Sequence, residues 1–176
     1  MKKALLIVLA TLCIANFAYA KDYIGVYYDT IHSLCTRTAT GDVYFYYYIW
    51  ALPAPRGMQA VEFKILFPPM VYDFGSMTLN AGINLTLGDI QTGWSATFAN
   101  CTYGWTQIYR QRVYVDTGIA PSGVIQIVKT DDSQNLGLAS CDMMDWPFTV
   151  LNHGGINVPC LIGTKDASWG AIKSIF

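Results

Sequence analysis

Residues able to act in acid–base or nucleophilic catalysis are few in this sequence. It has two histidines, His32 and His153, and a hydrolytic triad would need one of them beside a serine and a carboxylate. Ser33 and Ser140 are present, but no G-x-S-x-G elbow exposes a nucleophile. His153 precedes Gly154-Gly155, a pattern that favours a turn. We therefore predict that the protein is not an enzyme.

The carboxylates do not form a recognisable catalytic or metal-binding pattern. Glu62 is the only glutamate and stands beside Lys64, which favours a cross-strand ion pair over a glycosidase pair. Asp131-Asp132 and Asp142-Met-Met-Asp145 are expected to be turn residues. Either pair could instead offer oxygen ligands to Ca²⁺, although neither has EF-hand spacing. Two histidines cannot form a three-histidine zinc site. We predict no cofactor and no metal.

Aromatic residues make up 14% of the chain, with 12 tyrosines and 5 tryptophans. Tyr44, Tyr46, Tyr48 and Trp50 alternate along one run, so they fall on the same face of a strand. Such a face could stack on the rings of a glycan, or it could form part of the core. The sequence leaves open whether this face is exposed, so it remains a candidate ligand-stacking surface.

The elements that would position these residues are mainly strands. The run from Met58 to Phe67 alternates cleanly, with Val61 and Phe63 on one side and Lys64 on the other. Similar strand patterns recur every 10 to 15 residues between turn signals, which favours an all-β, antiparallel β-sandwich. The other predicted strands are Tyr23–Tyr28, Val43–Trp50, Thr78–Ile90 (one or two strands), Gly93–Ala99, Trp105–Val115, Gly123–Thr130 and Leu136–Cys141.

The first twenty residues have the pattern of a secretory signal peptide. Lys2 and Lys3 precede an apolar run, and Ala18-Tyr19-Ala20 matches a small-x-small cleavage site. We expect residues 1–20 to be removed, which leaves no transmembrane span. The expected location is the periplasm, the cell surface or the extracellular medium.

The C-terminal end is expected to differ from the sandwich. Residues 21–163 would form one β-sandwich domain, and residues 164–176 a short helical tail. Trp169, Ile172 and Phe176 would then share one stripe of that helix. This stripe is a candidate docking or sorting segment.

Removal of the leader would leave four cysteines, an even number that predicts two disulfides in an exported chain. They are Cys35, Cys101, Cys141 and Cys160, and three pairings are possible. We favour Cys35 with Cys101 and Cys141 with Cys160, since the second bond would close the Gly154-Gly155 loop.

Charge excludes one class of partner. The whole chain has a net charge of -1, and loss of Lys2 and Lys3 leaves 9 basic against 12 acidic residues, a net charge of -3. There is no cluster of lysines or arginines to follow a phosphate backbone, so we expect no nucleic-acid partner.

Four short motifs carry a family resemblance. They are Ile24-Gly-Val-Tyr-Tyr-Asp29 before Cys35, Trp94-Ser-Ala-Thr-Phe-Ala-Asn-Cys101, Leu138-Ala-Ser-Cys-Asp142 before Cys160, and Ser168-Trp-Gly-Ala-Ile-Lys-Ser-Ile-Phe176. With them the chain resembles secreted bacterial β-sandwich proteins of unassigned activity that end in a short Trp-Gly-x-x-Lys tail. The resemblance implies an exported Ig-like or cohesin-like module without catalytic residues.

The sequence thus predicts a secreted, non-catalytic β-sandwich module with an interaction or cell-surface structural role. Its partner would be another extracellular protein or a glycan. One alternative is a carbohydrate-binding module that uses the Tyr44 to Trp50 face. A second alternative, which we disfavour, is a secreted hydrolase.

Overall fold

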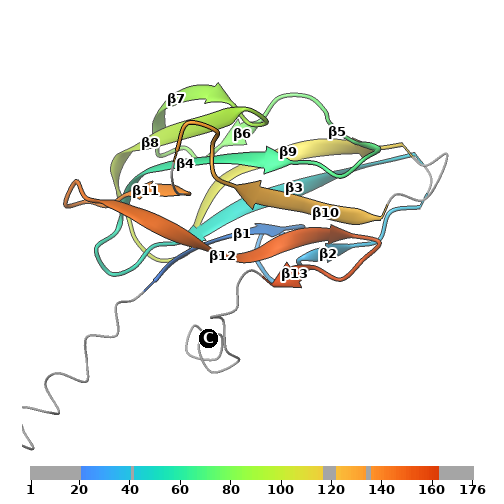
Figure 1. Cartoon of the computed structure of the whole chain (residues 1–176), viewed down its shortest axis with the longest axis horizontal. Coiled ribbons are helices and arrows are strands. Elements are labelled where there is room, and N and C mark those ends of the chain that lie inside the picture. Colours follow the sequence, from blue (N-terminus) through green and yellow to red (C-terminus); the bar gives the residue numbers. More distant parts are fainter. Residues whose placement is uncertain (1–20, 41, 117–121, 134–135, 163–176) are drawn as a thin grey trace, which may run out of the picture.

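The computed structural model describes residues 21–40, 42–116, 122–133 and 136–162 (Figure 1). The predicted signal peptide and the predicted helical tail, with Trp169, Ile172 and Phe176, lie outside the described residues. Every regular element within them is a strand. This part of the chain contains no helix long and apolar enough to cross a membrane.

Thirteen strands follow one another along the described chain (Figure 1). They are β1 (Asp22–Tyr27), β2 (Thr36–Arg37), β3 (Val43–Leu52), β4 (Met58–Leu66), β5 (Val71–Asp73), β6 (Thr78–Leu79), β7 (Ile83–Asp89), β8 (Gly93–Thr102), β9 (Thr106–Val115), β10 (Gly123–Val128), β11 (Gly137–Ala139), β12 (Asp145–Ile156) and β13 (Leu161–Ile162).

The strands form two layers that face one another across an aromatic core. Their order is β5-β9-β3-β1-β12-β10-β4-β8-β7, and the path folds so that β4 and β8 pack against β9. Phe63 of β4 stacks on Tyr109 of β9 with ring centroids 6.2 Å apart, and Trp94 of β8 lies 5.5 Å from the same ring. These contacts confirm the predicted all-β sandwich.

Two buried hydroxyl groups pair inside this core. The Tyr47 and Tyr109 hydroxyl oxygens are 3.2 Å apart and share a hydrogen bond. Burial raises the pKa of both hydroxyls, and the proximity of Asp73 adds to the rise. The shared hydrogen bond gives each buried hydroxyl a protein partner.

The prediction of a purely antiparallel sandwich is wrong at β12. This strand pairs in parallel with β1, from Asp22 opposite Phe148 onward, and in parallel with β2. It also pairs with β11 at its start and with β10 at its end, so it connects the two layers. The first long strand and the last therefore lie side by side.

His153 lies inside β12, which corrects the prediction that it belongs to a turn. Its Nδ1 accepts a hydrogen bond from the backbone N–H of Ile127, at 3.3 Å. Burial lowers the pKa of this imidazole. The imidazole of His153 in β12 is therefore hydrogen-bonded to the backbone of β10.

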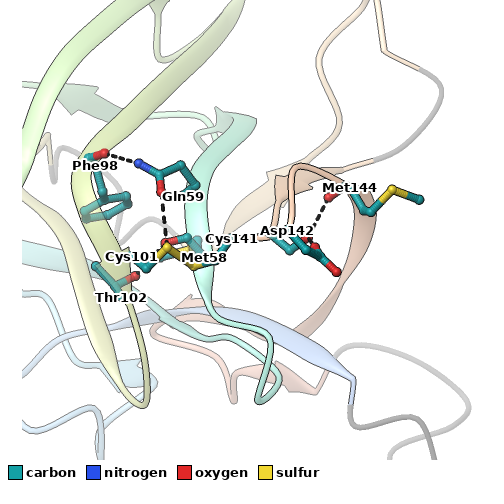
Figure 2. Close-up of a disulfide and its surroundings, with 9 residues drawn as sticks. Met58, Gln59, Phe98, Cys101, Thr102, Cys141, Asp142 and Met144 are labelled. Atoms are coloured by element: carbon teal, nitrogen blue, oxygen red, sulfur yellow. Dashed lines mark hydrogen bonds between the residues drawn. A yellow bond between two sulfur atoms is a disulfide. The ribbon is translucent and has the colours of Figure 1, made fainter.

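The structure pairs all four predicted cysteines, but not in the favoured way. The disulfides are Cys35–Cys160 and Cys101–Cys141. The first follows from topology, because β12 runs parallel to β1 and β2, which puts the segments that follow β1 and β12 at the same end. The second ties the end of β8 to the turn after β11, beside Gln59, whose side-chain amide donates to the Phe98 carbonyl at 2.5 Å (Figure 2).

Asp142 lies in a turn, as predicted, whereas Glu62 is bound by hydroxyl groups. Glu62 does not pair with Lys64 but accepts a hydrogen bond from the Thr130 hydroxyl at 2.6 Å. Lys64 instead forms an ion pair with Asp131, at 2.5 Å. The reason is the turn after β10, which brings its hydroxyl and carboxylate groups over β4. Asp142 accepts from the Ser140 hydroxyl within its own turn.

Candidate binding face

The four aromatic residues predicted as one stacking face do not share one environment. Tyr44 and Tyr46 are 50% and 41% exposed, whereas Tyr48 is only 8% exposed and Trp50 is half-buried. All four lie on the outer side of β3, because Phe45 and Tyr47 between them point into the core. One half of this outer face is open, and the other half is covered.

The covered half is built from four rings and an imidazole. The His32 ring stacks on Trp105 with centroids 4.2 Å apart and an interplanar angle of 21°. It also lies 5.0 Å from the ring of Trp50, and Tyr27 of β1 packs edge-on against both His32 and Trp105. Tyr48 stands opposite Tyr27 in the β1–β3 register.

His32 reaches this position because the loop between β1 and β2 folds over the sheet. The Asp29 carboxylate accepts hydrogen bonds from the backbone N–H groups of Ser33 at 2.9 Å and of Leu34 at 3.1 Å. Burial alone would raise the pKa of Asp29, but the hydrogen bonds from the Ser33 hydroxyl and from these two N–H groups outweigh it and lower the pKa. The Tyr28 N–H donates to the Leu34 carbonyl at 2.7 Å, which closes the loop just before the Cys35–Cys160 disulfide.

The open half continues from β3 across two neighbouring strands. Tyr44 stands opposite Tyr114 of β9, and Tyr114 stands opposite Tyr72 of β5. The Tyr44 ring lies 4.9 Å from Tyr114 and 4.9 Å from Phe74, which follows β5. Tyr72 and Phe74 are also exposed, so the rings form a continuous aromatic surface open to solvent.

Two arginines of β9 complete this surface. The guanidinium carbon of Arg112 lies 4.8 Å from the Phe74 ring centroid and 5.5 Å from that of Tyr44. The guanidinium carbon of Arg110 lies 5.3 Å from the Tyr46 centroid. We define the aromatic–arginine face as the set Tyr44, Tyr46, Tyr72, Phe74, Arg110, Arg112 and Tyr114.

Charges at the margin of the face act on one of its hydroxyls. Desolvation raises the pKa of Tyr114, and the carboxylates of Asp42 and Asp116 raise it further. The Tyr114 hydroxyl therefore stays neutral at physiological pH, since an unperturbed tyrosine already titrates near pH 10. The positive charge of the face comes from Arg110 and Arg112.

Sequence reasoning placed Tyr44 and Tyr46 on the candidate surface but missed Tyr72, Phe74 and Tyr114. Alternation along the predicted strand Trp105–Val115 places Arg110, Arg112 and Tyr114 on one side. What the sequence lacked was the β3–β9 register, which sets Tyr46 opposite Arg112. Residues 71–74 were not predicted as a strand at all, because Pro68-Pro69 ended the previous one.

The opposite layer carries a hollow of about 330 Å³ over β4, β8 and β11. Its lining includes the polar residues Glu62, Ser95 and Thr97 and the ring of Trp146. Glu62 is already held by Thr130, and Arg56 covers the Trp146 ring at 3.9 Å while pairing with Asp22. In the described ranges, no three His, Cys, Asp or Glu side chains come together as a metal-binding group.

Comparison with known proteins identifies the fold. No family model and no curated protein matches the sequence. Among solved structures, the chain is similar to a non-cellulosomal cohesin from the hyperthermophilic archaeon Archaeoglobus fulgidus, with a TM-score of 0.55 and 11% identity over 78% of this chain and 90% of that chain. The fold is cohesin-like.

A second solved structure supports the same assignment. A chain of the CaDoc0917–CaCohA2 complex matches with a TM-score of 0.56 and 11% identity, over 79% of this chain and 100% of that chain. At this identity the cohesin-like similarity describes the arrangement of strands and not a shared binding site.

Proposed function

We propose that this protein is an exported, non-catalytic interaction module that binds a protein partner through the aromatic–arginine face. The observation that carries the proposal is the exposure of four neighbouring rings, Tyr44, Tyr46, Tyr72 and Phe74, beside two arginines. Tyrosine and arginine are enriched at protein interfaces, and contiguous exposed aromatic surface is uncommon on monomers that bind nothing.

Other features support export and a binding role. Two disulfides fit an oxidising compartment, and the amino-terminal pattern of the sequence fits a signal peptide. Both histidines have structural contacts, His32 with Trp105 and His153 with Ile127. One of the two similar cohesin-like structures was determined within a complex.

The test compares two pairs of substitutions with matched exposure. Tyr44→Ser with Tyr72→Ser changes the face, where each tyrosine is 50% exposed, and Leu85→Ser with Leu87→Ser changes β7 in the other layer, where exposure is 51% and 62%. Each protein, with its disulfides formed, is immobilised and exposed to secreted proteins from the source cells. Circular dichroism verifies folding.

We expect the wild type and the β7 variant to retain the same partner and the face variant to lose it. Equal retention by all three proteins would contradict the proposed face. A glycan array run with the same set tests the carbohydrate-binding alternative. A glycan bound by the wild type and lost in Tyr46→Ala would favour that alternative over a protein partner.

A further inference from the structure

The two arginines of the face are held by aromatic rings and not by carboxylates. Within the described ranges Arg56 pairs with Asp22 and Lys64 pairs with Asp131, and neither of these two ion pairs involves Arg110 or Arg112. Each of these two guanidinium groups lies over a ring, at 5.3 Å from Tyr46 for Arg110 and 4.8 Å from Phe74 for Arg112. A guanidinium stacked in this way keeps its N–H donors at its edge, free to bind a carboxylate in a bidentate manner.

Elsewhere in the protein, a guanidinium that lies over an aromatic ring also binds a carboxylate. Arg56 lies 3.9 Å from the ring of Trp146 and, at the same time, pairs with the carboxylate of Asp22. Asp22 is buried and also accepts the backbone N–H of Ala54 at 2.7 Å. That site has three parts: a ring, a guanidinium and a carboxylate. The aromatic–arginine face repeats the ring and the guanidinium twice, on exposed strands.

We propose that the partner supplies the missing carboxylates, as an extended protein segment with acidic side chains two residues apart. This inference rests on the proposed function of the face. Arg110 and Arg112 are two positions apart on one side of β9, which separates their Cα atoms by about 7 Å. Acidic residues at positions i and i+2 of an extended segment repeat at the same spacing and on one side.

The rest of the face fits the remainder of such a segment. Tyr72 and Phe74 are themselves two positions apart and lie beside the arginines, so they can contact apolar side chains that flank the acidic pair. Charge complementarity also favours this partner, because the seven residues that define the face include two arginines and no acidic side chain. Asp42 and Asp116 lie near Tyr114, at the margin of the face. Their negative charge would repel the two acidic side chains of the partner from this margin and so favour their binding at Arg110 and Arg112.

The experiment uses two synthetic peptides that differ only in charge, Thr-Val-Glu-Thr-Glu-Val-Thr and the same peptide with both Glu replaced by Gln. Each is titrated into the isotopically labelled protein, and amide chemical shifts are followed by NMR. We expect the Glu peptide to shift amides of β3, β5 and β9 and the Gln peptide to bind at least about fivefold more weakly. Raising the salt concentration should weaken the first interaction.

Single substitutions locate the charge effect. Arg112→Gln should weaken binding of the Glu peptide at least about fivefold, while Lys129→Gln, which removes a positive charge from an exposed site elsewhere, should leave it unchanged. Arg112→Lys keeps the charge but loses the planar fork, so it should bind with intermediate affinity. Equal binding of both peptides, or no loss in Arg112→Gln, would overturn the proposal.

The outcomes separate this inference from the proposed function. If Tyr44→Ser with Tyr72→Ser abolishes retention of the secreted partner and Arg110→Gln with Arg112→Gln does not, the face binds a protein but the acidic segment is wrong. If neither pair of substitutions affects retention, both proposals fail. Binding of an acidic polysaccharide such as polygalacturonate, with no response to the Glu peptide, would overturn the acidic protein segment in favour of a glycan.

Discussion

The two halves of the outer face of β3 have similar residues and opposite environments. Tyr46 and Tyr48 are the same residue type, two positions apart on one strand, yet Tyr46 is 41% exposed and Tyr48 is 8% exposed. Around Tyr48 lie the rings of Tyr27 and Trp50 and the loop that carries His32. The guanidinium of Arg110, on the neighbouring strand β9, lies over the Tyr46 ring.

This difference shows that the pattern of a strand does not decide which of its outward residues are buried. Alternation along β3 separates core from outer face, but a loop from another part of the chain covers only half of that face. The covered half contributes to stability, whereas the open half keeps its aromatic surface available for binding. The next four experiments test this division.

The largest effect is expected from opening the disulfide that closes the covering loop. Cys35→Ser with Cys160→Ser removes a bond that spans 125 residues, and the loss of chain constraint should lower the free energy of unfolding by roughly 4 to 5 kcal/mol. Chemical denaturation measures the change. Tryptophan fluorescence should shift to longer wavelength as Trp105 and Trp50 become exposed to water.

The matched control for this experiment is the other disulfide. Cys101→Ser with Cys141→Ser opens a bond that spans 40 residues, and the expected loss is about 4 kcal/mol. Because this bond joins the end of β8 to the turn after β11 and not the loop between β1 and β2, the tryptophan emission of the covered half should shift less. The same fluorescence shift in both variants would contradict a specific role for Cys35–Cys160 in holding the loop.

The second experiment compares the two tyrosines directly. Tyr48→Ala removes a buried ring and should lower the free energy of unfolding by about 3 kcal/mol. Tyr46→Ala removes an exposed ring and should cost less than about 1 kcal/mol. Urea denaturation of both variants gives the comparison, and equal losses would show that the two halves do not differ in their contribution to stability.

The third experiment removes the carboxylate that organises the loop. Asp29→Ala deprives the Ser33 and Leu34 N–H groups of their acceptor, which should cost about 1 to 2 kcal/mol. Hydrogen exchange should become faster at residues 29–35 and remain unchanged in β5. Asp132→Ala, an exposed carboxylate outside this loop, serves as the control and should have little effect on either measurement.

The smallest effect is expected from pH. Desolvation lowers the pKa of His32, against the opposing effect of Asp29, so the folded protein binds this proton less readily than the unfolded chain. The contribution of His32 to the free energy of unfolding is therefore constant above about pH 7. It falls as the pH drops below about 6.5, the pKa of histidine in the unfolded chain. Near-UV circular dichroism between pH 7.5 and 5 should report the change.

Substitution separates this titration from that of the other histidine. His32→Gln should remove the spectral change of the covered half, while His153→Gln should leave it in place, because His153 contacts Ile127 in a different region. The seven residues that define the aromatic–arginine face include no histidine, so the binding properties of the face should not follow the same curve. If His32→Gln left the pH profile unaltered, the spectral change could not be assigned to the titration of His32.

Strands with clean alternation could be predicted from sequence, and these form most of the core. Val61 and Phe63 of β4 are buried as expected. Within the predicted strand Trp105–Val115, alternation places Tyr109 and Val113 on one side, and both are buried in β9. The burial of these positions could be predicted because side chains alternate between the two faces of a strand whatever strands it pairs with. The candidate face was predictable only in part, through Tyr44 and Tyr46.

The longest strand, β12, was missed because its pattern is interrupted by residues that tertiary contacts require. A Cβ on Gly154 would lie 2.7 Å from Val26 and from the Tyr28 hydroxyl, so only glycine allows β1 to pack so closely. A Cβ on Gly155 would meet the Val158 carbonyl oxygen at 2.3 Å. Local rules assign such glycines to a turn. The favoured Cys141–Cys160 pairing depended on this predicted turn, whereas the structure pairs Cys160 with Cys35.

The parallel pair of β1 and β12 has a consequence for the order of folding. Asp22 pairs with Phe148 and Cys35 is bonded to Cys160. One edge of β1 therefore has no partner strand until the C-terminal part of the domain has been synthesised. Contacts of such sequence separation are slow to form. While the chain emerges from the ribosome, one edge of β1 must remain open, and that edge is where premature association between chains is most to be expected.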